Sequence, residues 1–128
     1  MKDNFSAQSA EYAIYRPTYP KALYDYLLSL VKDKKAAWDC ATGNGQVARV
    51  LAQHFEKVYA TDISEKQLSQ ALKVPNIYYR VEPAEQVSAV ADSFDLITVA
   101  QAIHWFNFEA FYAEVKRTLK PDGLFAVI

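Results

Sequence analysis

The apolar residues of the chain follow two different spacings along its length. A helical spacing of Leu23, Leu27, Leu30 and Val31 predicts a helix that begins at Pro20, a favourable first residue of a helix. Further helical patterns cover 6–15, 46–55, 64–73 and 107–119. Short, mostly apolar runs typical of buried strands cover 36–41, 57–61, 77–81, 94–99 and 124–128. This alternation predicts an α/β fold, with a doubly wound, mostly parallel sheet of about five strands and helices on both faces.

Polar residues at the ends of these elements support the predicted boundaries. Ser64 and Gln67 form a capping box, and Asn107 is a suitable cap for the last helix. The sequence KPDG over 120–123 predicts a turn before the final strand. We find no linker, so residues 1–128 are expected to form one domain. Within it, 1–35 form an N-terminal helical cap segment and 36–128 form the α/β core.

Composition and charge narrow the class of protein. The chain has 128 residues, with 14 basic and 15 acidic side chains, so its formal net charge is −1. Nucleic-acid binding usually requires a basic excess, so no nucleic-acid partner is expected. No apolar run reaches the roughly 18 residues of a membrane span, and the first residues lack the apolar stretch of a signal peptide. The single cysteine, Cys40, fits a reduced compartment, and the protein is expected in the cytoplasm without a membrane partner.

A polar turn follows the first predicted strand. Asp39 lies within an otherwise apolar run, where a carboxylate needs a partner, and Gly43 and Gly45 allow close approach of a ligand to the backbone. A zwitterion would fit here, with its ammonium at Asp39 and its carboxylate at the amides of 43–46. A tight turn without a ligand remains an alternative. A dinucleotide site is another, because Gly43, Gly45 and Ala48 match G-x-G-x-x-A, although Asp39 would repel a pyrophosphate.

The next two strands also end in candidate binding residues. Asp62 can accept both hydroxyls of a ribose, or it can be a charge at the start of the following helix. Ile63 can cover one face of a flat base. The loop over 82–85 is placed to reach the edge of that base, although a loop without this role is equally consistent with the sequence.

After the fourth predicted strand come Gln101, His104 and Trp105 in an apolar setting. His104 can be a hydrogen-bonded structural residue, a substrate contact or a general base. Trp105 can belong to the core or line a pocket.

Taken in order, these segments resemble the class I S-adenosylmethionine (SAM)-dependent methyltransferases, and in particular the small-molecule group called methyltransferase type 11. The resemblance rests on WDCATGNG over 38–45, ATDIS over 60–64, FDLI over 94–97 and LKPDG over 119–123. Tyr12 and YRPTYP over 15–20 resemble a segment that closes over the site in the family. AQAIHWF over 100–106 is similar to a subset that acts on small organic acids or metabolites.

The resemblance implies SAM as the cofactor, a small-molecule acceptor and no metal ion. It assigns the methionine part of SAM to Asp39, Ala41, Gly43, Gly45 and Gln101, the ribose to Asp62, and the adenine to Ile63, Ala84 and Glu85. It assigns the acceptor side to Tyr12, Tyr15, Arg16, His104 and Trp105, with His104 as the base.

The implied function is methyl transfer to a small molecule. A SAM-binding module without turnover and a nicotinamide-dependent oxidoreductase are the alternatives. The aromatic residues, Arg16 and the small net charge favour a small, acidic acceptor.

Two features depart from the family pattern. Pro83 stands where many relatives have an aspartate, so adenine recognition is expected to rely on Glu85 or on the backbone. The family sheet also has more strands than this sequence supplies, which suggests a fragment or a sheet that a partner completes. Because an open edge strand invites pairing, a homodimer through 124–128 is expected.

Overall fold

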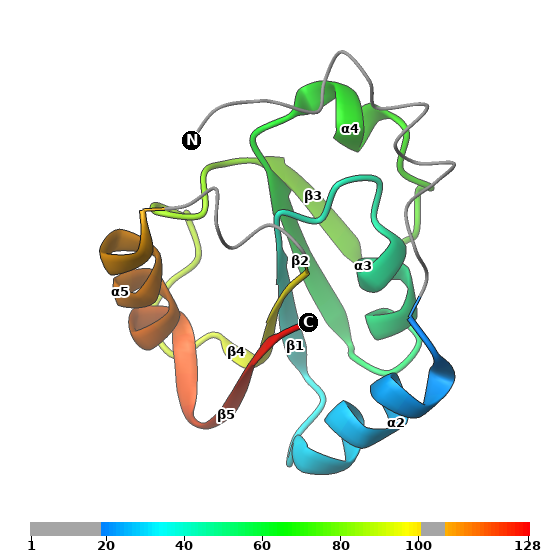
Figure 1. The fold of residues 1–128 in the computed structure, drawn as a ribbon, viewed down its shortest axis with the longest axis vertical. Coiled ribbons are helices and arrows are strands. Elements are labelled where there is room, and N and C mark those ends of the chain that lie inside the picture. The colour runs from blue at the N-terminus through cyan, green and yellow to red at the C-terminus, as the bar shows by residue number, and fades with distance from the viewer. Residues whose placement is uncertain (1–18, 101–106) are drawn as a thin grey trace.

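The computed structural model describes residues 19–100 and 107–128. Five parallel strands form one sheet in the order β3-β2-β1-β4-β5 (Figure 1). The strands are β1 (Ala36–Cys40), β2 (Lys57–Asp62), β3 (Ile77–Val81), β4 (Phe94–Val99) and β5 (Leu119–Val127). The chain builds outward from β1 to β3 and then crosses back to β4 and β5. The predicted doubly wound parallel sheet is therefore confirmed.

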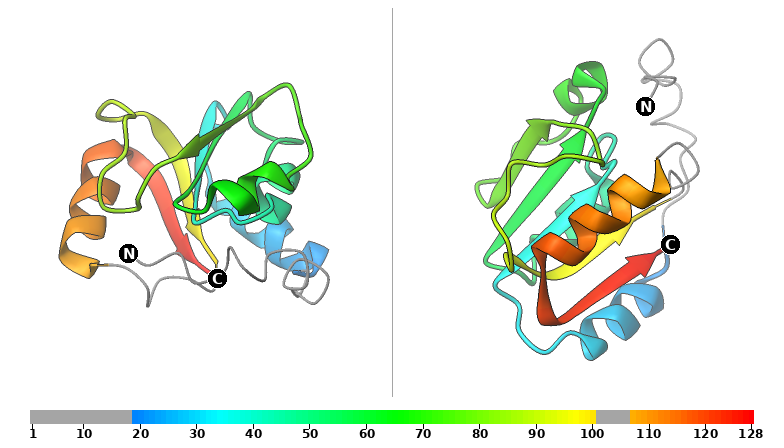
Figure 2. Two further views of the ribbon diagram at one scale, coloured as in Figure 1. Left: turned by 90° about the horizontal axis from the view of Figure 1, so that it is seen from above. Right: turned by 90° about the vertical axis from the view of Figure 1, so that its left-hand side faces the viewer.

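Helices cover both faces of this sheet (Figure 2). On one face lie α2 (Lys21–Leu30) and α3 (Gln46–Leu51), and on the other lies α5 (Phe108–Thr118). The short α4 (Glu65–Ser69) packs beside β2 and β3. The predicted helix over 6–15 lies outside the described residues, so the division into cap segment and core stays a prediction. In the part of the chain that the structure describes, no helix has the length and apolar character needed to cross a membrane.

Each face of the sheet has its own apolar core. The core under α2 and α3 includes Leu27, Leu28, Val47, Leu51, Val58 and Leu96. The core under α5 includes Trp38, Phe94, Ile97, Phe111 and Val115. Trp38 is fully buried, and its indole N–H donates a hydrogen bond of 3.0 Å to Oγ1 of Thr61. Because alternate strand residues face opposite cores, both faces of the central strands are apolar.

Several predicted helix details are wrong. α3 ends at Leu51 because the following residues form turns, and these turns still bury Phe55. α4 ends at Ser69, although Ser64 caps it as predicted by accepting the N–H of Gln67 at 3.1 Å. Asn107 likewise caps α5.

The predicted apolar face of α2 is confirmed at Leu23, Leu27 and Val31 and is wrong at Leu30. Tyr24 and Leu28 are buried beside Leu27, whereas Leu30 is 51% exposed. Pro20 precedes the helix as its N-cap residue. The buried face therefore includes most of the predicted stripe and extends to Tyr24 and Leu28, on the side that packs against the core.

The predicted turn over 120–123 is a bulge within β5. Leu119 pairs with Phe94, and Leu124 pairs with Leu96, so the residues between them have no room in the ladder. Pro121 and Asp122 are exposed there. β5 forms one end of the described sheet, and association of two copies through 124–128 stays a prediction.

Asp95, in the fourth-strand motif, joins β4 to the start of β1. Its buried Oδ2 accepts the N–H of Lys35 at 3.1 Å and that of Ala36 at 3.0 Å. Its Oδ1 receives a hydrogen bond of 3.1 Å from Nζ of Lys120. One carboxylate therefore satisfies two backbone donors at the point where the sheet begins.

We predict that Asp95→Ala lowers the free energy of unfolding by about 3 kcal/mol, because it leaves these buried donors without their acceptor. Urea denaturation measures the loss. Asp25→Ala is the matched control, since Asp25 forms an exposed pair with Lys21 and its removal should cost less than about 0.5 kcal/mol. Equal losses in the two variants would contradict the assignment.

Candidate functional site

The carboxyl ends of the parallel strands meet at one edge of the sheet. The chain reverses its direction of winding between β1 and β4, and in such sheets ligands bind just outside this switch point. Asp39 on β1 is in register with Thr98 on β4 at this place. The predicted site therefore lies at the position that the topology favours.

Asp39 is the buried charge at the switch point, with 2% of its surface exposed. Oγ1 of Thr42 donates to its Oδ2 at 2.7 Å, and Oγ1 of Thr98 donates to its Oδ1 at 2.8 Å. Two of the partners that a buried carboxylate requires are thus hydroxyl groups of the protein. The role of Asp39 toward a ligand ammonium stays a prediction.

The turn after β1 has an unusual backbone. Ala41, Gly43 and Gly45 adopt left-handed conformations, with φ of 54°, 60° and 86°. The φ of Gly45 favours glycine, and a Cβ there would also lie 2.6 Å from the hydroxyl oxygen of Tyr79 on β3, which would have to move. The turn curves tightly and brings its amides to the end of β2.

Asp62 holds this turn from the end of β2. Its Oδ2 accepts the N–H of Gly43 at 2.9 Å, and its Oδ1 accepts the N–H of Ser64 at 2.9 Å. Both oxygens of the half-buried Asp62 thus fix the backbone around the end of β2, and its role toward a ribose stays a prediction. Ile63, also half-buried, follows directly.

The loop after β3 is tied to the beginning of α5. Oε2 of the half-buried Glu85 accepts the N–H of Asn107 at 2.9 Å. Ala84, beside it, is buried in the core under α5. These contacts give the two residues predicted for adenine a defined position.

The pKa of the Cys40 thiol is affected by the negative charges of the site. Burial raises the pKa of its thiol well above the ordinary value, and the negative charges of Asp39, Asp62 and Glu85 raise it further. Asp39 on β1, Asp62 at the end of β2 and Glu85 in the loop after β3 thus act on the same thiol, and their negative field favours a cationic ligand.

The other predicted residues, Tyr12, Tyr15, Arg16, Gln101, His104 and Trp105, lie outside the described residues. Sequence reasoning missed Thr98 and the contact of Tyr79 with Gly45. Neither contact could be predicted, because each depends on the order of the strands in the sheet. The hydroxyl of Thr42, three residues after Asp39, was the one partner that local spacing could have indicated.

Comparison with known proteins gives the family of this site. A family model described as a methyltransferase domain matches residues 38–127, which is most of the chain and includes the whole strand-end site. The chain belongs to this methyltransferase family. Its expected resemblance to the class I SAM-dependent methyltransferases is confirmed.

Relatives of this methyltransferase domain occur in distant organisms. It is 42% identical over 122 residues to a Dictyostelium discoideum protein with a provisional methyltransferase name, in a match that covers 94% of this chain and 46% of that protein. It is 33% identical over 132 residues to CRG1 of Saccharomyces cerevisiae, named as a probable S-adenosylmethionine-dependent methyltransferase, covering 96% of this chain and 45% of CRG1. A solved structure from Anaeromyxobacter dehalogenans, provisionally described as a type II methyltransferase, superposes with a TM-score of 0.83 at 41% identity, covering 88% of this chain and 48% of that one. The methyltransferase domain described here thus spans about half the length of the curated relatives it matches.

We predict that Gly45→Ala destabilises the methyltransferase domain by about 1–2 kcal/mol from the left-handed backbone alone, with a further cost from the contact with Tyr79. A double-mutant cycle with Tyr79→Phe, measured by urea denaturation, separates the two costs. Gly45→Ala should cost less when it is combined with Tyr79→Phe, since the hydroxyl oxygen that the Cβ meets is then absent. The same cost with and without Tyr79→Phe would exclude the contact as a cause.

Proposed function

We propose that this methyltransferase domain transfers a methyl group from SAM to a small-molecule acceptor. The observation that carries the proposal is the glycine turn after β1, bound by the carboxylates of Asp39 and Asp62, with Glu85 adding to the same negative field. SAM carries a sulfonium and an ammonium, and a site with this negative field favours such a ligand.

Three parts of the site fit three parts of SAM. The turn over 41–45 offers backbone groups to the methionine part. Asp62 offers two fixed oxygens to the ribose hydroxyls. Ala84 and Glu85 stand at the adenine end, and Ile63 lies next to Asp62 to cover the base. The name of the yeast relative, which includes S-adenosylmethionine, supports the same cofactor.

The same charges disfavour a nicotinamide cofactor. A dinucleotide would bring a pyrophosphate to the turn after β1, where Asp39 and Asp62 lie close by. A SAM-binding module without turnover is the other alternative, because the chain spans about half the length of its curated relatives. Formation of a methylated product distinguishes it from the enzyme.

SAM supplies a methyl group that its sulfonium has already activated. The residues of the protein have to align the acceptor with that methyl group and exclude water. A base is needed only where the acceptor carries a proton, and His104 is the candidate. Tyr12, Tyr15, Arg16, Gln101 and Trp105 complete the proposed surroundings. A single buried cysteine held as a thiol suits the cytoplasm, where we place the protein.

We predict that calorimetric titration shows binding of SAM and of its demethylated product S-adenosylhomocysteine, and no binding of NAD. The reason is the negative field at the turn, which attracts the ammonium that both adenosyl ligands carry, together with the sulfonium of SAM, and repels the pyrophosphate of NAD. Binding of NAD in preference to the adenosyl ligands would contradict the proposal.

Asp62→Asn tests the ribose assignment. We predict a loss of about 1–3 kcal/mol in binding of S-adenosylhomocysteine, because a charged acceptor becomes a neutral one. Glu65→Gln is the matched control, since it removes an exposed carboxylate three residues further along the chain. Equal affinity in the two variants would remove Asp62 from the site.

A further inference from the structure

The connection from β3 to β4, residues 82–93, contains no helix. Parallel strands are usually joined through a helix, which satisfies its own backbone groups. Here the hydrogen bond from Gln86 N–H to the carbonyl of Pro83, 3.4 Å long, is the one backbone bond recorded within the connection. The remaining polar groups of the loop backbone need partners from elsewhere.

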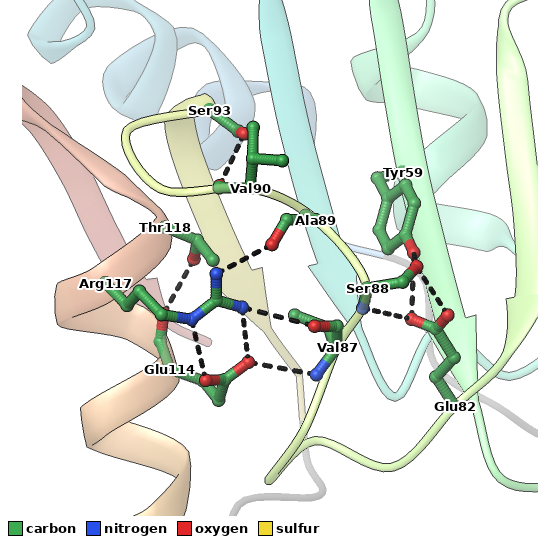
Figure 3. A network of polar contacts seen from close by, with 10 residues as sticks. All are labelled: Tyr59, Glu82, Val87, Ser88, Ala89, Val90, Ser93, Glu114, Arg117 and Thr118. Carbon is green, nitrogen blue, oxygen red and sulfur yellow. Dashed lines mark hydrogen bonds and ion pairs between the residues drawn. The ribbon is translucent and has the colours of Figure 1, made fainter.

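A pair of charged side chains on α5 provides several of them (Figure 3). Arg117 donates from Nη1 to the carbonyl of Ala89 at 2.8 Å and from Nη2 to the carbonyl of Val87 at 3.2 Å. Oε2 of Glu114 accepts the N–H of Val87 at 2.9 Å. Two side chains one turn apart on α5 thus hold three backbone groups of the loop.

Arg117 and Glu114 also bind each other through two hydrogen bonds. Nε of Arg117 donates to Oε1 of Glu114 at 2.9 Å, and Nη2 donates to Oε2 at 2.8 Å, which is a bidentate contact. The Glu114 side chain is 14% exposed and that of Arg117 is 38% exposed. The hydrogen bonds from Arg117 lower the pKa of Glu114, so this carboxyl stays charged at neutral pH. A lysine could not reproduce this fork.

The other side of the loop is held by Glu82, at the end of β3. Its Oε1 accepts the N–H of Ser88 at 3.2 Å, and its Oε2 accepts the hydroxyl of Ser88 at 2.7 Å. Tyr59 on β2 also donates to Oε1 at 2.8 Å. The successive N–H groups of Val87 and Ser88 are therefore bound by carboxylates on opposite sides, as Figure 3 shows.

Gln86 alone separates this bound part of the loop, residues 87–89, from Ala84 and Glu85. Glu85 is in turn bound to the N–H of Asn107, the N-cap residue of the same helix. α5 thus contacts the loop both at its cofactor end and at residues 87–89. Glu85 and Val87 are only two positions apart, so the contacts at 87–89 help to fix where the loop places Ala84 and Glu85.

We propose that Arg117, paired with Glu114, is a positioning residue that sets the adenine selectivity of the cofactor site. The inference rests on the proposed function, in which Ala84 and Glu85 meet the adenine amine. Arg117 does not touch the cofactor. It acts by holding residues 87–89 of the loop, so that the adenine amine can form its hydrogen bond at Ala84 and Glu85.

The test compares two ligands, S-adenosylhomocysteine and S-inosylhomocysteine, in which a carbonyl replaces the adenine amine. In Arg117→Gln, calorimetry should show about tenfold weaker binding of the adenosyl ligand, because the hydrogen bond to its amine is weakened. Binding of the inosyl ligand, which lacks that bond, should change much less. A second variant, Arg117→Lys, keeps the charge and one donor, so its selectivity should lie between those of the unaltered protein and Arg117→Gln. If Arg117→Gln does not fold, the unaltered protein is compared with Arg117→Lys instead.

Lys116→Gln is the matched control, because it removes an exposed positive charge from the neighbouring position of α5 and should leave the selectivity unchanged. Thermal unfolding of each variant is measured beside its affinities. A lower melting temperature with unchanged selectivity, or equal weakening of both ligands, would show that Arg117 is only structural and would overturn the inference. If the unaltered protein binds neither ligand, the proposed function is wrong, and the inference that rests on it is wrong as well. If the unaltered protein prefers the adenosyl ligand and Arg117→Gln keeps the same preference, the inference about Arg117 is wrong and the proposed function still stands.

Discussion

The carboxylate of Asp39 joins the two halves of the sheet at the point where the chain reverses its winding. It lies almost completely out of water, where an unpartnered charge would cost several kcal/mol. Thr98 on β4 and Thr42 in the following turn supply its hydrogen bonds. The backbone N–H of Thr42 in turn donates to the carbonyl of Thr61 on β2 at 2.9 Å. Satisfying this charge therefore fixes the start of the turn after β1, and Asp62 fixes Gly43 within it.

The two ends of the site are supported in different ways. The end beside the glycine turn is held by the sheet, because Asp39 and Asp62 bond the turn from adjacent strands. The end at Ala84 and Glu85 belongs to a loop without regular structure, and α5 holds it with charged side chains. Side chains of α5, which is distant in the sequence, therefore bind backbone groups of the loop that a helix within the connection would satisfy by itself.

Much of the fold could be predicted because it depends on local pattern. β3 and β4 have the predicted bounds, and Ser64 and Asn107 cap the predicted helices, since capping involves residues three positions apart. The site residues Asp39, Gly43, Gly45 and Asp62 could be found because each follows from its place at a strand end. The early ends of α3 and α4 and the exposure of Leu30 could not, because packing against the sheet decides how far each helix extends and which of its sides is buried.

The sequence by itself determined the alternation of strands and helices, the carboxylates at the strand ends and the methyltransferase family. Tertiary structure alone decided which side chains meet across the sheet and between helix and loop. Thr98 reaches Asp39 across 59 positions of the chain, and Arg117 reaches Val87 across 30. The physical reason is that such hydrogen bonds depend on strand order, register and helix placement. These result from the burial of both apolar faces of the sheet, and local spacing does not encode them.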